Sequence, residues 1–183
     1  MEFDSASAGV SFGGLVSSSE IKILICYILN SVKEPVPATE LCELLNFEGI
    51  ANIFEVSDNL ESLVKMNHIC CTDENAQTYT VTKTGKEIAD TLRASVPISV
   101  RDKACLATLK MLARRKNMKE TDIKISHEGE NTFITCSALE NGVSAISVKL
   151  MVADEAQAIA IKNNFIENPS KIYSDIINLF TKE

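Results

Sequence analysis

The segment that decides the fold is NIFEVSDNLESLVKMNHICCTDENAQTYTVTKTGKEIADTL, residues 52–92. Its first part has apolar residues at helical spacing, at Ile53, Val56, Leu60, Leu63 and Val64. This spacing predicts a helix that ends near Met66. Two strand-compatible runs follow, residues 68–72 and 78–81, and the polar segment between them predicts a β-hairpin. Thr82 is a suitable N-cap for another helix directly after the hairpin.

Two further helices precede this segment. The first is predicted by apolar residues on one helical face, namely Ile21, Leu24, Ile25, Ile28, Leu29 and Val32. Pro35 and Pro37 interrupt that pattern, and residues 38–45 restart it with Thr39 as a plausible N-cap. Three helices, a hairpin and a closing helix, in this order within residues 20–95, predict a winged helix-turn-helix domain.

A second domain is expected after the Val96-Pro97-Ile98 joint, because proline restricts both itself and the preceding residue to extended conformations. Its predicted elements are a helix, three strands and two helices, at residues 100–117, 121–127, 132–139, 143–152, 154–167 and from Pro169 onward. The turns between the strands are short, which favours an antiparallel meander. The predicted fold class is therefore α+β, with a small α/β domain over residues 96–183 that serves dimerisation or sensing.

The first nineteen residues, with their glycines and serines, predict a flexible tail, residues 1–19. Glu2 and Asp4 stand where a secretory signal would carry Lys or Arg, so we expect a cytoplasmic protein. No apolar run approaches the roughly 18 residues that a membrane-spanning helix needs, and no membrane partner is expected.

The net charge of −7 is unevenly distributed along the 183 residues. Residues 20–95 contain six Lys and Arg against twelve Asp and Glu, whereas residues 96–183 contain twelve against eleven. The predicted winged-helix domain therefore has a net charge of −6 and the second domain +1. Because duplex DNA attracts positive surface, DNA contact by the first domain would have to depend on a few local cations.

Three segments resemble those of a known family: IKILICYILNSV, NIFEVSDNLESLVKMNHI and YTVTKTGKEIADTL. The resemblance is to an uncharacterised domain-of-unknown-function family of Gram-positive anaerobes, and it covers residues 19–182. That family is regarded as regulator-like, with a winged-helix N-terminal half akin to PadR and MarR repressors. The resemblance implies that Glu55, Ser57, Asp58, Asn59 and Ser62 lie on the exposed face of a recognition helix. It also implies that residues 73–77 form the tip of the wing.

The candidate DNA-binding residues are Ser57, Asn59, Ser62, Lys65, Lys83 and Lys86. Polar side chains on a recognition helix read base edges, and lysines neutralise phosphates. The acidic residues on the same helix and the acids Asp73 and Glu74 at the wing tip oppose this reading. Because acidic and basic residues both occur on this surface, a second interpretation stays open, in which the acidic face binds another protein.

Residue types that could support catalysis are scarce. His68 and His127 stand alone without any recognisable catalytic spacing, and each is expected to be a surface or hairpin residue. The six cysteines form no CxxC pair, and four of them lie in apolar periodic segments, which favours buried thiols. We therefore expect no enzyme activity, no metal site and no cofactor.

A basic patch at the end of the helix over residues 100–117 is the strongest positive feature of the chain. Its members are Lys110, Arg114, Arg115, Lys116 and Lys119. A solvated helix end explains them most simply, because cations are favourable near a helix C-terminus. A phosphate-contacting surface and a docking site for an acidic face are the alternatives.

Two functions are compatible with these patterns. The first is a transcriptional regulator that binds DNA as a homodimer through its winged helices. The second is an interaction adaptor whose acidic winged-helix face binds a protein partner without specific DNA binding. The predicted domain order favours the first, and the charge of the recognition helix favours the second.

Overall fold

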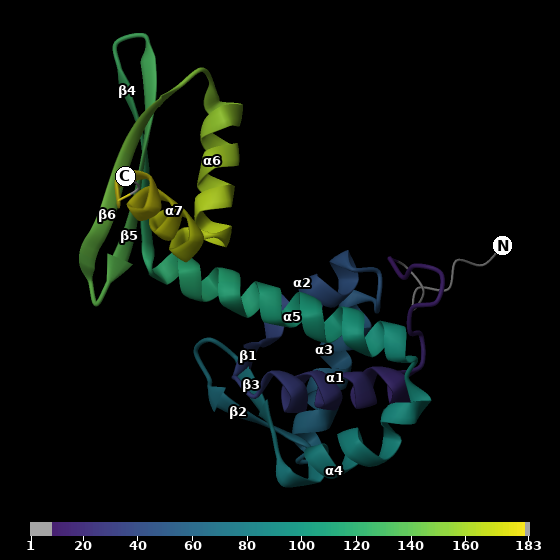
Figure 1. The fold of residues 1–183 in the computed structure, drawn as a ribbon. Coiled ribbons are helices and arrows are strands. Elements are labelled where there is room, and N and C mark those ends of the chain that lie inside the picture. Colours follow the sequence, from purple (N-terminus) through teal and green to yellow (C-terminus); the bar gives the residue numbers. More distant parts are fainter. Residues whose placement is uncertain (1–8, 182–183) are drawn as a thin grey trace, which may run out of the picture. The chain divides into compact units, whose positions relative to one another are not determined.

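A computed structural model describes residues 9–181 and is of the α+β class (Figure 1). Within these residues it has seven α-helices and two three-stranded antiparallel sheets. The elements are α1 Ser18–Val32, β1 Val36–Pro37, α2 Ala38–Phe47, α3 Ile53–Lys65, β2 Ile69–Asp73, β3 Thr78–Val81, α4 Lys83–Leu92, a short 3-10 helix Arg93–Ser95, α5 Ile98–Lys119, β4 Thr121–Glu128, β5 Asn131–Glu140, β6 Val143–Val152, α6 Glu155–Glu167 and α7 Pro169–Thr181. The seven expected helices, the hairpin and the three-stranded meander are confirmed.

The chain forms two compact units, and the division between them falls within α5, between Met111 and Leu112. The sequence places the domain boundary earlier, at residue 96, where Pro97 marks a joint. Val96 is buried and accepts a hydrogen bond from the Arg101 side chain at 3.1 Å, so the first turn of α5 is attached to the N-terminal unit. The Arg101 guanidinium also lies 5.1 Å from the centre of the Tyr27 ring of α1.

The N-terminal unit is built around α1, which contributes eight buried residues to the core. These are Ile21, Ile23, Leu24, Ile25, Cys26, Ile28, Leu29 and Val32. Helices α3 and α4 both contact α1, because a helix that is apolar on most of its circumference must be covered on several sides. Val56, Leu60 and Leu63 of α3 and Ala89 of α4 are buried on these sides.

The strand β1 is absent from the sequence-based prediction, which treats Pro35 and Pro37 only as helix breakers. In the structure Val36 pairs with Tyr79 and Pro37 with Thr78, so the sheet order is β1-β3-β2. Proline has no N–H for a strand ladder, and it is tolerated here because β1 is a two-residue strand at the sheet edge. The sequence signal of a strand this short is too weak to detect.

Residues that precede α1 are attached to the turn between α2 and α3. Ser11 N donates to Gly49 O at 2.8 Å, and Leu15 N donates to Ile50 O at 2.7 Å. Leu15 is buried. The sequence includes these residues in a flexible tail, whose residues 1–8 lie outside the part of the chain that the structure describes.

The C-terminal unit is the expected antiparallel meander, with strand order β4-β5-β6 and α6 along one face (Figure 1). Its core consists of Ile134, Cys136, Val152, Ala158 and Phe165. The turn between β5 and β6 uses Asn141 and Gly142 at φ 52° and 80°, which is the backbone form that an Asn-Gly hairpin favours.

Helix α7 differs from the sequence expectation, in which Ile172, Ile176, Ile177 and Phe180 all point inward. Ile172 packs against the core, but none of the α7 residues is fully buried. Ile177 is exposed, and Phe180 is 86% exposed. The apolar face of α7 is therefore only partly covered within its own unit.

Candidate nucleic-acid interface

Helix α3 is the element whose outer face the sequence assigns to base contacts. It begins after Asn52, whose side-chain oxygen accepts a hydrogen bond from Phe54 N at 2.8 Å. This cap satisfies one of the otherwise free amides of the first turn. Ser57 is exposed on the outer face, and Ser62 is half-buried at its border.

Asn59 requires a correction, because it faces inward. It is 3% exposed, its Oδ1 accepts a hydrogen bond from Ser18 Oγ at 2.6 Å, and its Nδ2 donates to Glu55 O at 2.7 Å. The amide thus connects α3 to the start of α1. Asn59 supports the position of α3 and is too deeply buried to contact a base edge.

Lys65 lies at the exposed C-terminal end of α3. Its Nζ is 3.7 Å from a carboxylate oxygen of Glu61, one turn earlier, and both side chains are largely exposed. Exposed pairs of this kind contribute about 0–1 kcal/mol. Lys65 can therefore exchange this partner for a phosphate at little cost.

The segment after the hairpin fixes the start of α4. The Thr82 hydroxyl oxygen accepts from Gly85 N at 3.2 Å, which makes Thr82 the N-cap that the sequence predicts. The hydroxyls of Thr82 and Thr84 both donate to Asn67 O, at 2.8 and 2.9 Å. These bonds attach the start of α4 to the turn that follows α3.

Lys83 and Lys86 are exposed in the first turn of α4, which contains no acidic residue. Cations at a helix N-terminus are unfavourable, because the free amides there already carry partial positive charge. An anion bound at this position would offset this unfavourable charge, because it would contact both the lysines and the free amides. The start of α4 thus combines two exposed lysines with the free amides of a helix N-terminus.

The tip of the β2–β3 hairpin is acidic, as the sequence predicts, and one of its acids forms the turn. Asp73 Oδ1 accepts hydrogen bonds from Asn75 N at 2.9 Å and from Ala76 N at 3.2 Å. Glu74 is exposed beside them, and residues 73–77 include no lysine or arginine. The tip of this hairpin therefore carries no positive charge.

The basic patch on α5 is divided between the two units. Lys110 is exposed and belongs to the N-terminal unit, whereas Arg114, Arg115 and Lys119 belong to the C-terminal one. Arg114 donates to Glu167 at 3.0 Å and to Asn163 at 3.2 Å, so it fastens α6 to α5. Arg115 is half-buried, and Lys119 is exposed.

The six cysteines differ in burial, and Cys136 is buried whereas Cys105 is partly buried. Cys26 and Cys42 are buried, and burial raises the pKa of each thiol to about 11. Cys70 and Cys71 are exposed on neighbouring positions of β2. Among residues 9–181 no group of three His, Cys, Asp or Glu side chains is arranged to hold a metal ion.

The two histidines lie apart from these groups. His127 Nδ1 lies 3.1 Å from Thr132 Oγ1 across the β4–β5 pair, and His68 is half-buried just before β2.

Among the described residues no helix is long and apolar enough to cross a membrane.

No curated protein and no solved structure matches the chain. One family model does match, that of a domain of unknown function, and it covers residues 21–180, which include both compact units. Because this match covers most of the chain, the protein belongs to the DUF4364 family.

Proposed function

We propose that this protein is a transcriptional regulator of the winged-helix type, which binds DNA as a homodimer and acts by binding rather than by catalysis. The observation that carries the proposal is the element order α1-β1-α2-α3-β2-β3, in which β1 pairs with the second strand of the hairpin. In a winged helix the third helix enters the major groove, and the hairpin is the wing. The resemblance of three segments to a family that is regarded as akin to PadR and MarR repressors supports the same reading. A regulator of this type acts in the cytoplasm, which is the location that the acidic amino terminus predicts.

The proposed DNA contacts are few. Lys83 and Lys86 at the start of α4 meet phosphates, and Lys65 adds a third cation from the end of α3. Ser57 and Ser62 are the polar candidates for base edges that remain after Asn59 is assigned to the core. Because the unit is acidic overall, its affinity depends on these local contacts and not on its average field.

The experiment is a gel-shift titration of genomic fragments with the double variant Lys83→Glu and Lys86→Glu. The proposal expects this variant to lose binding, with an unchanged melting temperature because both side chains are exposed. The matched control is Lys162→Glu with Lys171→Glu, two exposed lysines on α6 and α7 with the same total charge change. Equal loss in both double variants would contradict a specific role of α4.

An adaptor function is the second candidate, and one observation favours it. Phe47 and Phe54 are 87% and 76% exposed at the end of α2 and the start of α3, and the exposed acid Asp58 follows Phe54 by one helical turn. Exposed aromatic residues are typical of protein interfaces, where they bury large apolar area. If no fragment is retarded even at ~50 mM salt, where electrostatic attraction is little screened, this second function replaces the first.

A further inference from the structure

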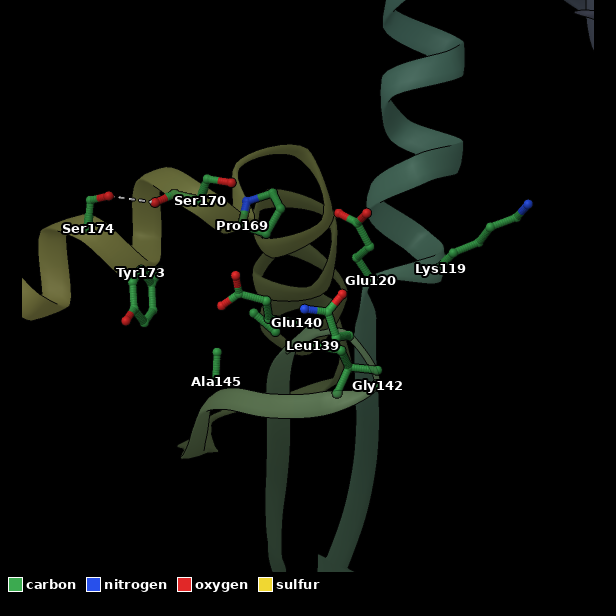
Figure 2. Close-up of a pocket in the computed structure, with 12 residues that line it drawn as sticks. Lys119, Glu120, Leu139, Glu140, Gly142, Ala145, Pro169, Ser170, Tyr173 and Ser174 are labelled. Atoms are coloured by element: carbon green, nitrogen blue, oxygen red, sulfur yellow. Dashed lines mark hydrogen bonds between the residues drawn. The ribbon is translucent and has the colours of Figure 1, made fainter. Parts of the chain in front are cut away.

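The C-terminal unit contains a pocket of about 710 Å³. The end of α5, the turn between β5 and β6 and the start of α7 line it (Figure 2). Its volume lies within the roughly 300–1,000 Å³ of typical small-molecule sites. No step of the DNA-binding proposal uses it.

Backbone contacts bring two carboxylates to this pocket. Leu139 N donates to Glu120 O at 2.7 Å, which joins the residue after α5 to the last part of β5. The tight turn at Asn141 and Gly142 then begins directly after Glu140. Glu120 and Glu140, twenty positions apart in the sequence, therefore line the same cavity.

Neither carboxylate is neutralised by a neighbour. Within the described chain, Glu120 and Glu140 form no ion pair and no side-chain hydrogen bond, whereas Glu128 is 2.6 Å from Lys149 in the same unit. Lys119 also lines the pocket, but its side chain extends away from Glu140 in Figure 2. The lining thus has two carboxylates, neither of them in an ion pair with a described residue, and one lysine that extends away from Glu140.

The remaining lining suits an organic group. Tyr173 is 39% exposed, so its ring is accessible from the pocket, and an aromatic face attracts a cation. Apolar surface comes from Ala138, Leu139, Ala145 and Pro169. A hydrated metal ion would gain nothing from these groups, whereas the carbon chain of an amine can lie against them.

We propose that this pocket binds a small organic cation, an aliphatic compound that carries ammonium or guanidinium groups. Glu120 and Glu140 accept hydrogen bonds from its charged ends, and Tyr173 covers its carbon chain. A bare divalent cation is the poorer fit, because two carboxylates without a third acidic, His or Cys ligand form no metal cluster among residues 9–181. The pocket and its ligand are independent of the DNA-binding proposal.

The test is calorimetric titration of the full chain at low salt with putrescine and with butanediol, the uncharged compound of the same length. We expect putrescine to bind at least about tenfold more tightly than the diol, because hydrogen bonds to charged groups are the stronger ones. Glu120→Gln and Glu140→Gln should each weaken putrescine binding several-fold. Glu130→Gln is the matched control, since Glu130 is an equally exposed acid in the β4–β5 turn outside the pocket.

Three results would overturn the proposal. They are no detectable heat with millimolar putrescine, equal affinity for the diol, and equal weakening in the Glu130 variant. The last result would mean that putrescine affinity depends only on the net charge of the protein and not on this pocket. All three side chains are exposed, so we expect the three variants to keep the melting temperature of the wild-type protein. Measuring these temperatures separates a loss of binding from a loss of folding.

Discussion

Asn59 is the residue for which the structure changes the predicted role, from base contact to a buried hydrogen-bonding group. Helical spacing and its amide group place it among the base-reading side chains, yet Ser18 and the carbonyl of Glu55 occupy its hydrogen-bonding groups. Ser18 is 41 positions away, and no local pattern reveals that it lies opposite Asn59. Ser57, Lys83 and Lys86, in contrast, are exposed as the sequence predicts, because no distant partner is involved.

Asn59→Ala should lower the free energy of unfolding. The substitution removes both hydrogen bonds and leaves a small void between α1 and α3, so we expect a loss of about 1–3 kcal/mol. Urea denaturation monitored by circular dichroism measures it. Ser57→Ala, an exposed substitution on the same helix, should stay within about 0.5 kcal/mol. If Asn59→Ala is as stable as Ser57→Ala, the buried hydrogen bonds contribute nothing.

Two pairs of cysteine thiols should differ in their reactivity. Cys70 and Cys71 are exposed and should react quickly with a thiol reagent at pH 8, whereas Cys26 and Cys42 should react only after unfolding. The reagent needs the thiolate, and burial raises the pKa of Cys26 and Cys42 to about 11. Time-resolved thiol counting in native and denatured protein gives the result. Fast reaction of all six cysteines in the native protein would contradict this burial.

The same two thiols give the stability a defined dependence on pH. Their pKa is 9.0 without burial and about 11 in the folded protein, so the unfolded chain releases these protons first. Their contribution to stability is complete below pH 9 and decreases as the pH rises toward 11. Urea midpoints measured between pH 8 and 11 should therefore fall. Constant midpoints over this interval would contradict the direction of the pKa shift.

At the scale of elements, long periodic segments are predictable and edge elements are not. Helix α1 and the β4-β5-β6 meander follow from apolar spacing and from the Asn-Gly turn. The strand β1 has only two residues, one of them proline, and its pairing partner lies more than forty positions later. The apolar face of α7 is visible in the sequence, but its partial exposure depends on how much of it α6 and the sheet can cover.

Gly85 makes the packing of α4 a testable element contact. A Cβ at this position would collide with the carbonyl oxygen of His68 and with the Val81 side chain. Alanine favours helices over glycine by about 1 kcal/mol, but a backbone clash of this kind costs more, typically 1–3 kcal/mol. We therefore expect Gly85→Ala to destabilise the protein in thermal unfolding.

The control for this contact is Thr91→Ala, an exposed position later in the same helix. It should be neutral or slightly stabilising, because only helix propensity changes there. A stabilising effect of both substitutions would mean that α4 does not approach the start of β2 as closely as the structure indicates.

At the scale of the whole molecule, both units leave apolar surface exposed. Leu106 and Leu109 of α5 are exposed in the N-terminal unit, and Leu179 and Phe180 of α7 in the C-terminal one. Large exposed apolar patches on soluble proteins mark interaction sites. They are compatible with the proposed homodimer, since paired recognition helices read symmetric sites.

Light scattering should therefore give a mass of about twice 20.0 kDa for the purified chain. Dilution should shift the mass toward the monomer value if the interface is weak, because dimers dissociate by mass action. A clean monomer at tens of micromolar would contradict both the dimer and the symmetric mode of DNA binding.

The salt dependence of DNA binding is the sharpest test of the proposed lysine–phosphate contacts. Each neutralised phosphate contributes a slope of about −0.9 to the plot of log affinity against log salt, so three lysines per subunit give about −3, or twice that for two subunits. We expect such a slope for the wild-type protein, and a smaller slope or no binding for the variant Lys83→Glu with Lys86→Glu. The contradicting result is wild-type protein that binds no fragment at low salt, or a slope that this double variant leaves unchanged.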